Sequence, residues 1–104
     1  MLDIKLEVSK KYDKYNKKYD AIIDDGEKIT RVSFGDNRFE DFTFHKDEER
    51  KKLYIGRRSN MEKKYLDDPY APAFYAMNIL WNKPTISKSI KDTNKRYKNI
   101  NIHI

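Results

Sequence analysis

The sequence predicts an α+β fold in which a small antiparallel sheet packs with about three helices. Apolar and polar residues alternate over residues 2–8 and again over residues 100–104, and a period of two is typical of a half-buried strand. The pair Asp25 and Gly26 separates two apolar runs, which is the strongest short-range signal of a hairpin. Two later segments carry apolar residues at helical spacing, which predicts helices that pack on the sheet.

Length and composition indicate one folded domain. The chain has 104 residues, a common size for a single domain, so we expect residues 1–104 to form one unit. Apolar and charged residues each make up 38% of the chain, whereas 13% of the residues are aromatic. Disordered segments are usually poor in aromatic residues. We therefore expect a folded chain whose core depends on Tyr, Phe and Trp side chains.

Charge and residue usage narrow the class of function. The net charge of +6 favours acidic partners such as nucleic acid, anionic proteins or a membrane surface. The chain contains no cysteine, which excludes disulfides, thiolate metal ligands and a cysteine nucleophile. Asp3, Lys5 and Glu7 interrupt any apolar leader. The longest apolar stretch, residues 71–81, is too short to cross a bilayer, so we expect neither a signal peptide nor a membrane span.

The N-terminal third is predicted to hold the strands. After the first strand, the Lys- and Tyr-rich residues 10–18 are interpreted as a solvated turn or loop. Two further strands, residues 19–23 and 29–34, flank the hairpin turn of residues 24–27. Gly35 is expected to end the last of these strands by supplying a backbone angle that other residues avoid.

A first helix is predicted to begin between Thr43 and Asp47, either of which could cap it. Acidic residues follow in the first turn, where the helix dipole favours negative charge. Arg50, Tyr54 and Arg57 stand at i, i+4 and i+7, so they share one face of this helix. Two guanidinium groups with an aromatic ring between them could bind phosphate or carboxylate and stack on a base.

This basic face has two readings. It can be a contact surface, or it can be a solvated helix face on which Tyr54 packs inward while the arginine stems lie along the surface. The candidate anion or nucleic-acid contacts are Arg50, Tyr54, Arg57, Arg58, Lys91 and Lys95.

Two more helices are predicted after the first. Residues 73–81 are apolar nearly all round, which indicates a buried helix, with Pro72 in its first turn. Pro84 ends that element, and Thr85 is a good N-cap for a third helix over residues 86–97. The structural anchor residues predicted here are Trp81, Pro84 and Thr85. Trp81 could instead anchor a protein interface.

No catalytic, cofactor or metal site is predicted. His45 lies two residues before Asp47, and a hydrogen bond at the helix start explains it better than acid–base catalysis. The segment Ser33–Gly35 does not form a phosphate-binding loop. Only two histidines are present, and no acidic calcium-type loop supports a metal.

Aromatic and apolar residues provide candidate contacts with other proteins. Phe39 and Phe42 are interleaved with Arg38 and Lys46, a pattern that suits base stacking, core packing or a protein interface. The tail is expected to form a short strand that is either added to the sheet or offered to a partner. The candidate protein-interface residues are Phe39, Phe42, Ile100, Ile102 and Ile104.

Several motifs together resemble a known family. They are the segments Val32-Ser33-Phe34-Gly35, His45-Lys46-Asp47 with Arg50-Lys51 and Tyr54, Leu80-Trp81-Asn82-Lys83-Pro84-Thr85, and Ser89-Ile90-Lys91-Asp92. The sequence from about residue 19 to residue 104 resembles a family of small uncharacterised proteins of the nucleocytoplasmic large DNA viruses, the giant viruses. The resemblance implies a viral origin, a location in the virion or in the viral factory of the host cytoplasm, and no known enzyme activity.

Two functions are expected from these observations. The first is a non-enzymatic minor structural component of a large DNA virus particle, which acts through protein–protein contacts with other virion proteins. The alternative is a basic nucleic-acid-binding accessory protein, whose affinity would fall steeply with salt because phosphate contacts release counterions.

Overall fold

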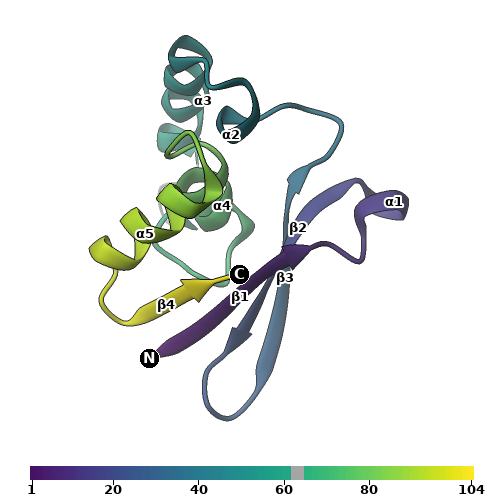
Figure 1. The fold of residues 1–104 in the computed structure, drawn as a ribbon, viewed down its shortest axis with the longest axis vertical. Helices are drawn as coiled ribbons and strands as arrows, with labels where there is room; N and C mark the ends of the chain where they lie inside the picture. The colour runs from purple at the N-terminus through teal and green to yellow at the C-terminus, as the bar shows by residue number, and fades with distance from the viewer. Residues whose placement is uncertain (62–64) are drawn as a thin grey trace.

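The structure is a computed structural model that describes residues 1–61 and 65–104 (Figure 1). Four strands form one sheet in the order β3-β2-β1-β4. Their bounds are β1 Leu2–Val8, β2 Lys17–Asp24, β3 Ile29–Asp36 and β4 Ile100–His103. Together with the helices below, this sheet confirms the predicted α+β fold.

The sheet is mixed, which corrects the expectation of a purely antiparallel one. β2 runs antiparallel to both β1 and β3, whereas β4 runs parallel to β1. The amide of Leu2 donates to the carbonyl of Asn99 at 2.9 Å, so β4 starts beside the N-terminus of the chain (Figure 1). A parallel pair needs a long crossover connection, and the helical segment between β3 and β4 provides it.

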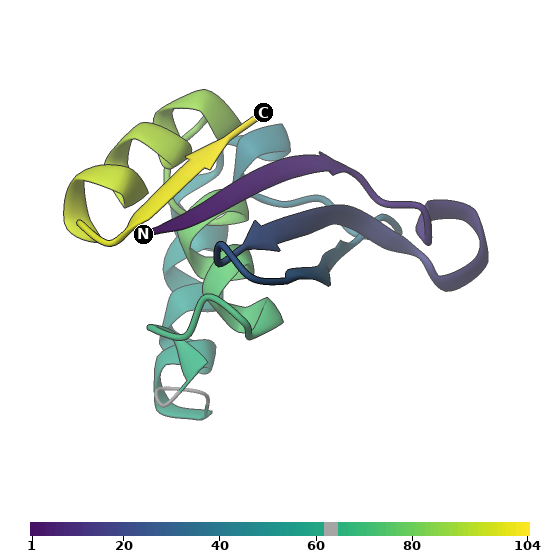
Figure 2. The same cartoon turned by 90° about the horizontal axis from the view of Figure 1, so that it is seen from below.

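The alternation of apolar residues decides which face of the sheet is buried. One face contributes pairs of buried side chains from each strand, and these are Ile4 and Leu6, Ala21 and Ile23, Val32 and Phe34, and Ile100 and Ile102. Helical residues Phe74, Tyr75, Ile79 and Leu80 complete this core. Figures 1 and 2 show α4 and α5 on this side of the sheet.

Turn chemistry fixes the hairpin between β2 and β3 as the sequence predicts. Gly26 has φ 96°, a conformation that glycine adopts without steric cost. The Asp25 carboxylate accepts hydrogen bonds from the amides of Glu27 and Lys28, both at 2.8 Å. The turn therefore sets the pairing register, which runs unbroken from Asp24 opposite Ile29 to Tyr19 opposite Phe34 and resumes with Lys17 opposite Asp36.

The helices are more divided than the sequence indicates. Their bounds are α1 Tyr12–Tyr15, α2 Phe42–His45, α3 Glu48–Met61, α4 Pro72–Tyr75, the π-helix η2 Ala76–Leu80 and α5 Ile86–Arg96. The predicted first helix is split into α2 and α3 because Lys46 between them has φ 57°, a left-handed conformation that ends a helix. Asp41 rather than Thr43 caps α2, since its carboxylate accepts from the Thr43 amide at 2.9 Å. The predicted cap Asp47 is confirmed at the start of α3, where its carboxylate accepts from the Glu49 amide at 3.0 Å.

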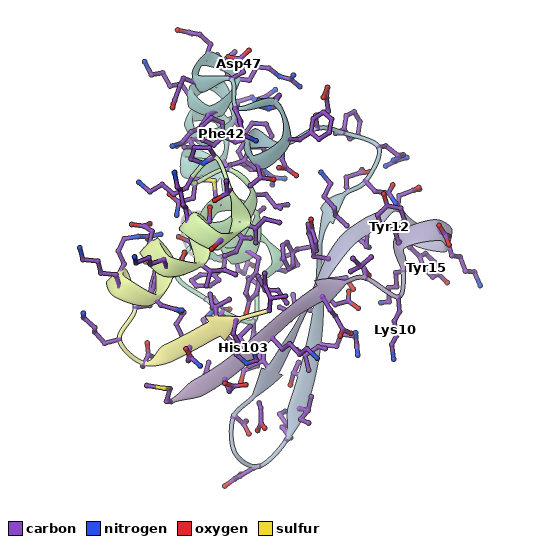
Figure 3. The ribbon with its side chains drawn as sticks, in the orientation of Figure 1. Lys10, Tyr12, Tyr15, Phe42, Asp47 and His103 are labelled. Atoms are coloured by element: carbon purple, nitrogen blue, oxygen red, sulfur yellow. The ribbon has the colours of Figure 1, made fainter. Side chains whose placement is uncertain are left out.

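The short helix α1 lies at one end of the sheet. The stretch predicted as a loop after β1 contains the single turn α1, which lies apart from helices α3 and α5. In Figure 3, Lys10, Tyr12 and Tyr15 mark this end of the sheet, whereas Phe42 and Asp47 mark the far end of the helical layer. The cleft described next lies between α3 and the α2-proximal end of β3.

Candidate functional site: a cleft between strand β3 and helix α3

A cleft of about 1010 Å³ separates β3 from α3 and from the segment that leads into α4. Its polar and charged lining includes Lys17, Lys18, Ser33, Asp36, Glu40, Asp41, Arg50, Arg57, Arg58 and Asp68. Its apolar and aromatic lining includes Phe34, Phe39, Leu53, Tyr54, Tyr65, Tyr70, Leu80 and Trp81. The cleft has the size of a small-ligand or peptide site.

The basic face of the first helix lines this cleft as the spacing predicts. Arg50, Tyr54 and Arg57 all contribute from α3, and Arg58 joins them. Lys91 and Lys95 are exposed on α5, outside the described lining. The six candidate anion contacts therefore fall into two separate groups.

An aromatic column holds α3 in place. The Tyr54 and Trp81 rings are stacked with centroids 4.2 Å apart and planes within 7°. His45 lies on Trp81 with a centroid distance of 5.3 Å, and Phe42 meets His45 edge to face at 6.2 Å. This column packs α3 against the segment that precedes α5 and so helps to fix the position of its arginines.

The Tyr54 ring packs within the fold, where it helps to hold α3 as one wall of the cleft. One face of its ring lies against Trp81, and the Arg58 guanidinium lies 5.4 Å from its centroid. This packing favours the second interpretation of the basic face, in which Tyr54 packs inward, over stacking of its ring on a base. Exposed aromatic surface in the cleft comes instead from Phe39, which is 68% exposed, with Tyr65 and Tyr70.

The acidic residues on the β3 side are largely neutralised. Lys18 forms an ion pair with Asp41 at 2.5 Å, and the Asp41 side chain is almost fully buried. Arg38 pairs with Asp36 at 2.7 Å, and its hydrogen bonds lower the pKa of Asp36 to about 2. Both carboxylates therefore already have a cationic partner within the chain.

Two of the arginines on the α3 side, Arg50 and Arg57, have no ion-pair partner among the residues that the structure describes. Both side chains are exposed and line the cleft. They are thus available to an anionic group that enters it.

Glycine is required where β3 borders the cleft. Gly35 has φ 79°, and a Cβ atom there would lie 2.9 Å from both Leu80 Cδ1 and Lys18 Cβ. The expected role of Gly35 as a special backbone position is confirmed, although β3 continues one residue further to Asp36.

Most of the predicted protein-interface residues are core residues. Phe42, Ile100 and Ile102 are 2%, 5% and 2% exposed, so their proposed role in a protein interface is wrong. The tail is added to the chain's own sheet, where β4 pairs with β1 and buries the two isoleucines. Phe39 and Ile104 are exposed, at 68% and 77%.

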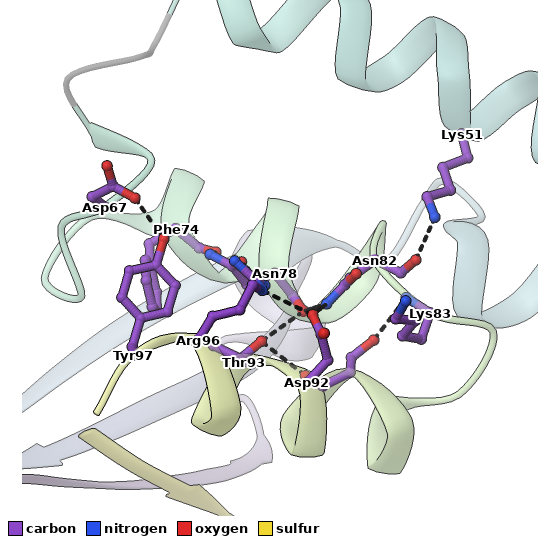
Figure 4. Close-up of polar contacts among 11 residues, drawn as sticks. Lys51, Asp67, Phe74, Asn78, Asn82, Lys83, Asp92, Thr93, Arg96 and Tyr97 are labelled. Carbon is purple, nitrogen blue, oxygen red and sulfur yellow. Dashed lines mark hydrogen bonds and ion pairs between the residues drawn. The ribbon is translucent and has the colours of Figure 1, made fainter. Parts of the chain in front are cut away.

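The Trp81–Thr85 segment anchors the helical layer as predicted. Thr85 caps α5 by accepting from the Lys88 amide at 3.1 Å. The segment is also fixed by polar contacts that the sequence did not indicate, drawn in Figure 4. Lys51 donates to the Asn82 carbonyl at 2.5 Å, and the Asn82 amide donates to Asp92 at 2.8 Å.

The centre of this network is Asn78, in the π-helix η2. Its carbonyl accepts from Thr93 at 3.2 Å, and its side-chain oxygen accepts from Arg96 at 2.6 Å (Figure 4). Its side-chain amide donates to the Phe74 carbonyl at 2.8 Å. These contacts satisfy a polar side chain that is 6% exposed. An asparagine in an otherwise apolar helix was the only sequence signal for it.

The remaining predictions concern His45, metal binding and membrane spans. His45 Nδ1 accepts from the Asp47 amide at 2.9 Å, which confirms the expected hydrogen bond at a helix start. Within the described ranges, no cluster of three or more His, Asp and Glu side chains could hold a metal ion. No helix in that part of the chain is both long and apolar enough to cross a membrane.

The fold and the cleft define a small α+β protein with a mixed sheet and a large surface cleft lined by charges of both signs. The chain belongs to the family of unknown function DUF5754, and residues 7–58 match the family model. This region includes β2, β3, α2 and Arg50 to Arg58 of α3, so both the strand wall and the arginines of the cleft lie in it. No curated protein and no solved structure matches the chain.

Proposed function

We propose that this protein is a non-enzymatic binding protein whose cleft takes an acidic segment of a partner protein. The observation that carries the proposal is the pair of guanidinium groups, Arg50 and Arg57, which have no ion-pair partner in the described part of the chain and face a cleft whose other side exposes Phe39. Arginine binds carboxylates through two parallel hydrogen bonds. An aromatic side chain beside such a pair supplies the apolar contact that is typical of interface centres.

The charge distribution favours a protein segment over a nucleic acid. Five cationic and four acidic side chains are found among the described lining residues, so the cleft is not a uniformly basic groove. A polyphosphate chain would meet Glu40 and Asp68 as well as the arginines. Lys91 and Lys95, which could extend a basic track, belong to another element.

The biological setting proposed for this binding rests on the sequence resemblance. A protein related to the small giant-virus proteins would act as a minor structural component of the virus particle. Its partners would then be other virion proteins, met in the particle or in the viral factory of the host cytoplasm. The buried tail leaves the cleft as the surface on which such contacts would be made.

Nucleic-acid binding remains the alternative proposal. It is favoured by the same two arginines, since a guanidinium group binds phosphate as readily as carboxylate. The two proposals differ in salt dependence. Neutralising several phosphates gives a steep fall of affinity with salt, whereas a segment held by two ion pairs and aromatic contacts loses less.

A displayed library of random peptides, selected on the purified full chain, tests the proposal. We expect enrichment of peptides that contain Asp or Glu next to apolar residues. Individual peptides should bind the Arg50→Ala, Arg57→Ala double variant at least about tenfold more weakly, since a hydrogen bond to a charged group contributes about 1.5–3 kcal/mol.

The matched control is the double variant Lys91→Ala, Lys95→Ala, which removes the same net charge from α5. It should bind the selected peptides with unchanged affinity. Equal losses in both double variants would mean that only net charge matters, which contradicts the proposal. Failure to enrich peptides, together with tight, steeply salt-dependent binding of single-stranded DNA or RNA, would establish the alternative.

A further inference from the structure

The two outer edges of the sheet differ in what lies beside them. β3 and β4 are the outer strands, and an outer strand has a row of backbone N–H and C=O groups without strand partners. Such an edge can pair with a strand from another chain, and proteins commonly cover or interrupt the edges at which pairing would be harmful.

The β4 edge is covered from within the chain. The Asn94 side chain, on α5, donates to the Ile102 carbonyl at 2.9 Å and accepts from the Ile102 amide at 2.8 Å. These two hydrogen bonds occupy both backbone groups of Ile102, as a neighbouring strand would. The tail is therefore not the site at which a partner strand would add.

The β3 edge borders the cleft instead. Ser33 and Phe34 are consecutive residues whose side chains point to opposite faces of the sheet, yet both line the cleft. The cleft therefore runs along the outer edge of β3. In the described ranges no strand pairs with β3 on that side, and β3 pairs with β2 without interruption from Ile29 to Phe34.

We propose that the partner segment binds as an added strand on the outer edge of β3, with an acidic side chain directed to Arg50 or Arg57. This inference rests on the proposed function, for which it specifies the conformation of the partner and the backbone that it contacts. The occupant is an extended, acidic protein segment, because its backbone can pair with β3 and its carboxylate complements the α3 wall.

Size and spacing agree with this occupant. A strand added to a sheet lies about 4.8 Å from its neighbour, and its side chains alternate between the two faces. The cleft of about 1010 Å³ extends from β3 to α3. Every second side chain of the added strand would then face α3, where Arg50 and Arg57 provide two cationic contacts, while Phe39, in the segment after β3, provides an apolar one.

The absence of cysteine from the sequence permits a direct test. In the full chain, Leu53→Cys places a single thiol on the cleft wall, since Leu53 is 64% exposed and lines the cleft. A peptide of alternating Val and Glu with one terminal Cys is then attached through a disulfide. Hydrogen exchange of each backbone amide is followed by NMR with and without the peptide.

We expect those amides within residues 33–36 that point away from β2 to exchange at least about tenfold more slowly when the peptide is attached, while the Ile102 amide is unchanged. A peptide with Lys in place of Glu, and one N-methylated at alternate residues, should each lose this protection. Unchanged exchange in β3 with the Val-Glu peptide would overturn the inference.

The two proposals fail in distinguishable ways. A library-selected peptide that depends on Arg50 and Arg57 but leaves β3 exchange unchanged would overturn strand addition and keep the proposed function. If no peptide is selected and the attached peptide gives no protection, both proposals are overturned.

Discussion

Tyr54 stacks on Trp81 with ring centroids 4.2 Å apart, and this contact joins α3 to the segment before α5. Trp81 in turn packs against the main core. The stack therefore holds α3, and with it the arginines on this helix, in place relative to the core. It also explains why a tyrosine placed between two arginines along the helix is not free to bind a ligand.

The Tyr54→Ala variant should lose this support for α3. We expect a loss of about 1–3 kcal/mol in the free energy of unfolding, since stacked aromatic pairs contribute beyond the area that they bury. Trp81 is the only tryptophan, so its fluorescence reports on the contact and should shift to longer wavelength. Tyr15→Ala removes a tyrosine that is 57% exposed on α1 and serves as the control. An unchanged emission spectrum in Tyr54→Ala would contradict the assigned role.

The Asn94→Ala variant should weaken the β4 edge. The substitution removes the side-chain amide that pairs with the N–H and C=O groups of Ile102. An unsatisfied polar group that is partly buried costs about 1–3 kcal/mol. Urea denaturation should show this loss, and the Ile102 amide should exchange faster. Asn101→Ala, on the same strand, removes only an exposed hydrogen bond to Asp3 at 3.3 Å and should change stability by less than about 0.5 kcal/mol. Equal effects of the two substitutions would argue against an edge cap.

Two glycines should respond oppositely to alanine. Gly35→Ala places a side chain at φ 79° and brings its Cβ to 2.9 Å from Leu80 and Lys18. We expect a loss of about 2 kcal/mol or more from this strain. Gly56→Ala adds a methyl group to α3 with nothing within 4 Å and should raise stability by about 0.5–1 kcal/mol. Thermal unfolding of both variants checks the prediction, which fails if Gly35→Ala is neutral.

Acid should destabilise the fold through Asp20. Burial would by itself raise the pKa of this carboxyl group, but hydrogen bonds from Ser33, Ser9, Arg31 and the Lys10 amide together lower it from 3.8 to about 2. Because the pKa in the folded state lies below that of the unfolded chain, the stabilisation is present above pH 3.8. It is lost as pH falls from 3.8 through about 2, and its size is roughly 2 kcal/mol.

The Asp20→Asn variant tests this pH dependence. It should be less stable near pH 6 and should lose part of the decline in stability between pH 4 and 2. Asp36, whose pKa is lowered to about 2 by Arg38, leaves a residual decline in this range. Asp13→Asn on α1 is the control and should follow the unaltered protein. A decline in Asp20→Asn that equals that of the unaltered protein would show that another group titrates there.

The sequence by itself determined the local elements. The period of two located β1 and β4, Asp25 and Gly26 specified the hairpin, and Thr85 marked the start of α5. The spacing of Arg50, Tyr54 and Arg57 predicted that they would lie together. Each of these features depends on residues that are close in the chain, where backbone preference and side-chain spacing act directly.

Tertiary structure decided the features that depend on distant contacts. It set β4 parallel to β1, buried Phe42 and the tail isoleucines, and paired Tyr54 with Trp81. It also stabilised a π-helix around Asn78, whose partners Thr93 and Arg96 lie on another helix. Burial and pairing are settled by packing between segments far apart in the sequence, so no local pattern could show which aromatic residues stay exposed or which edge of the sheet stays open.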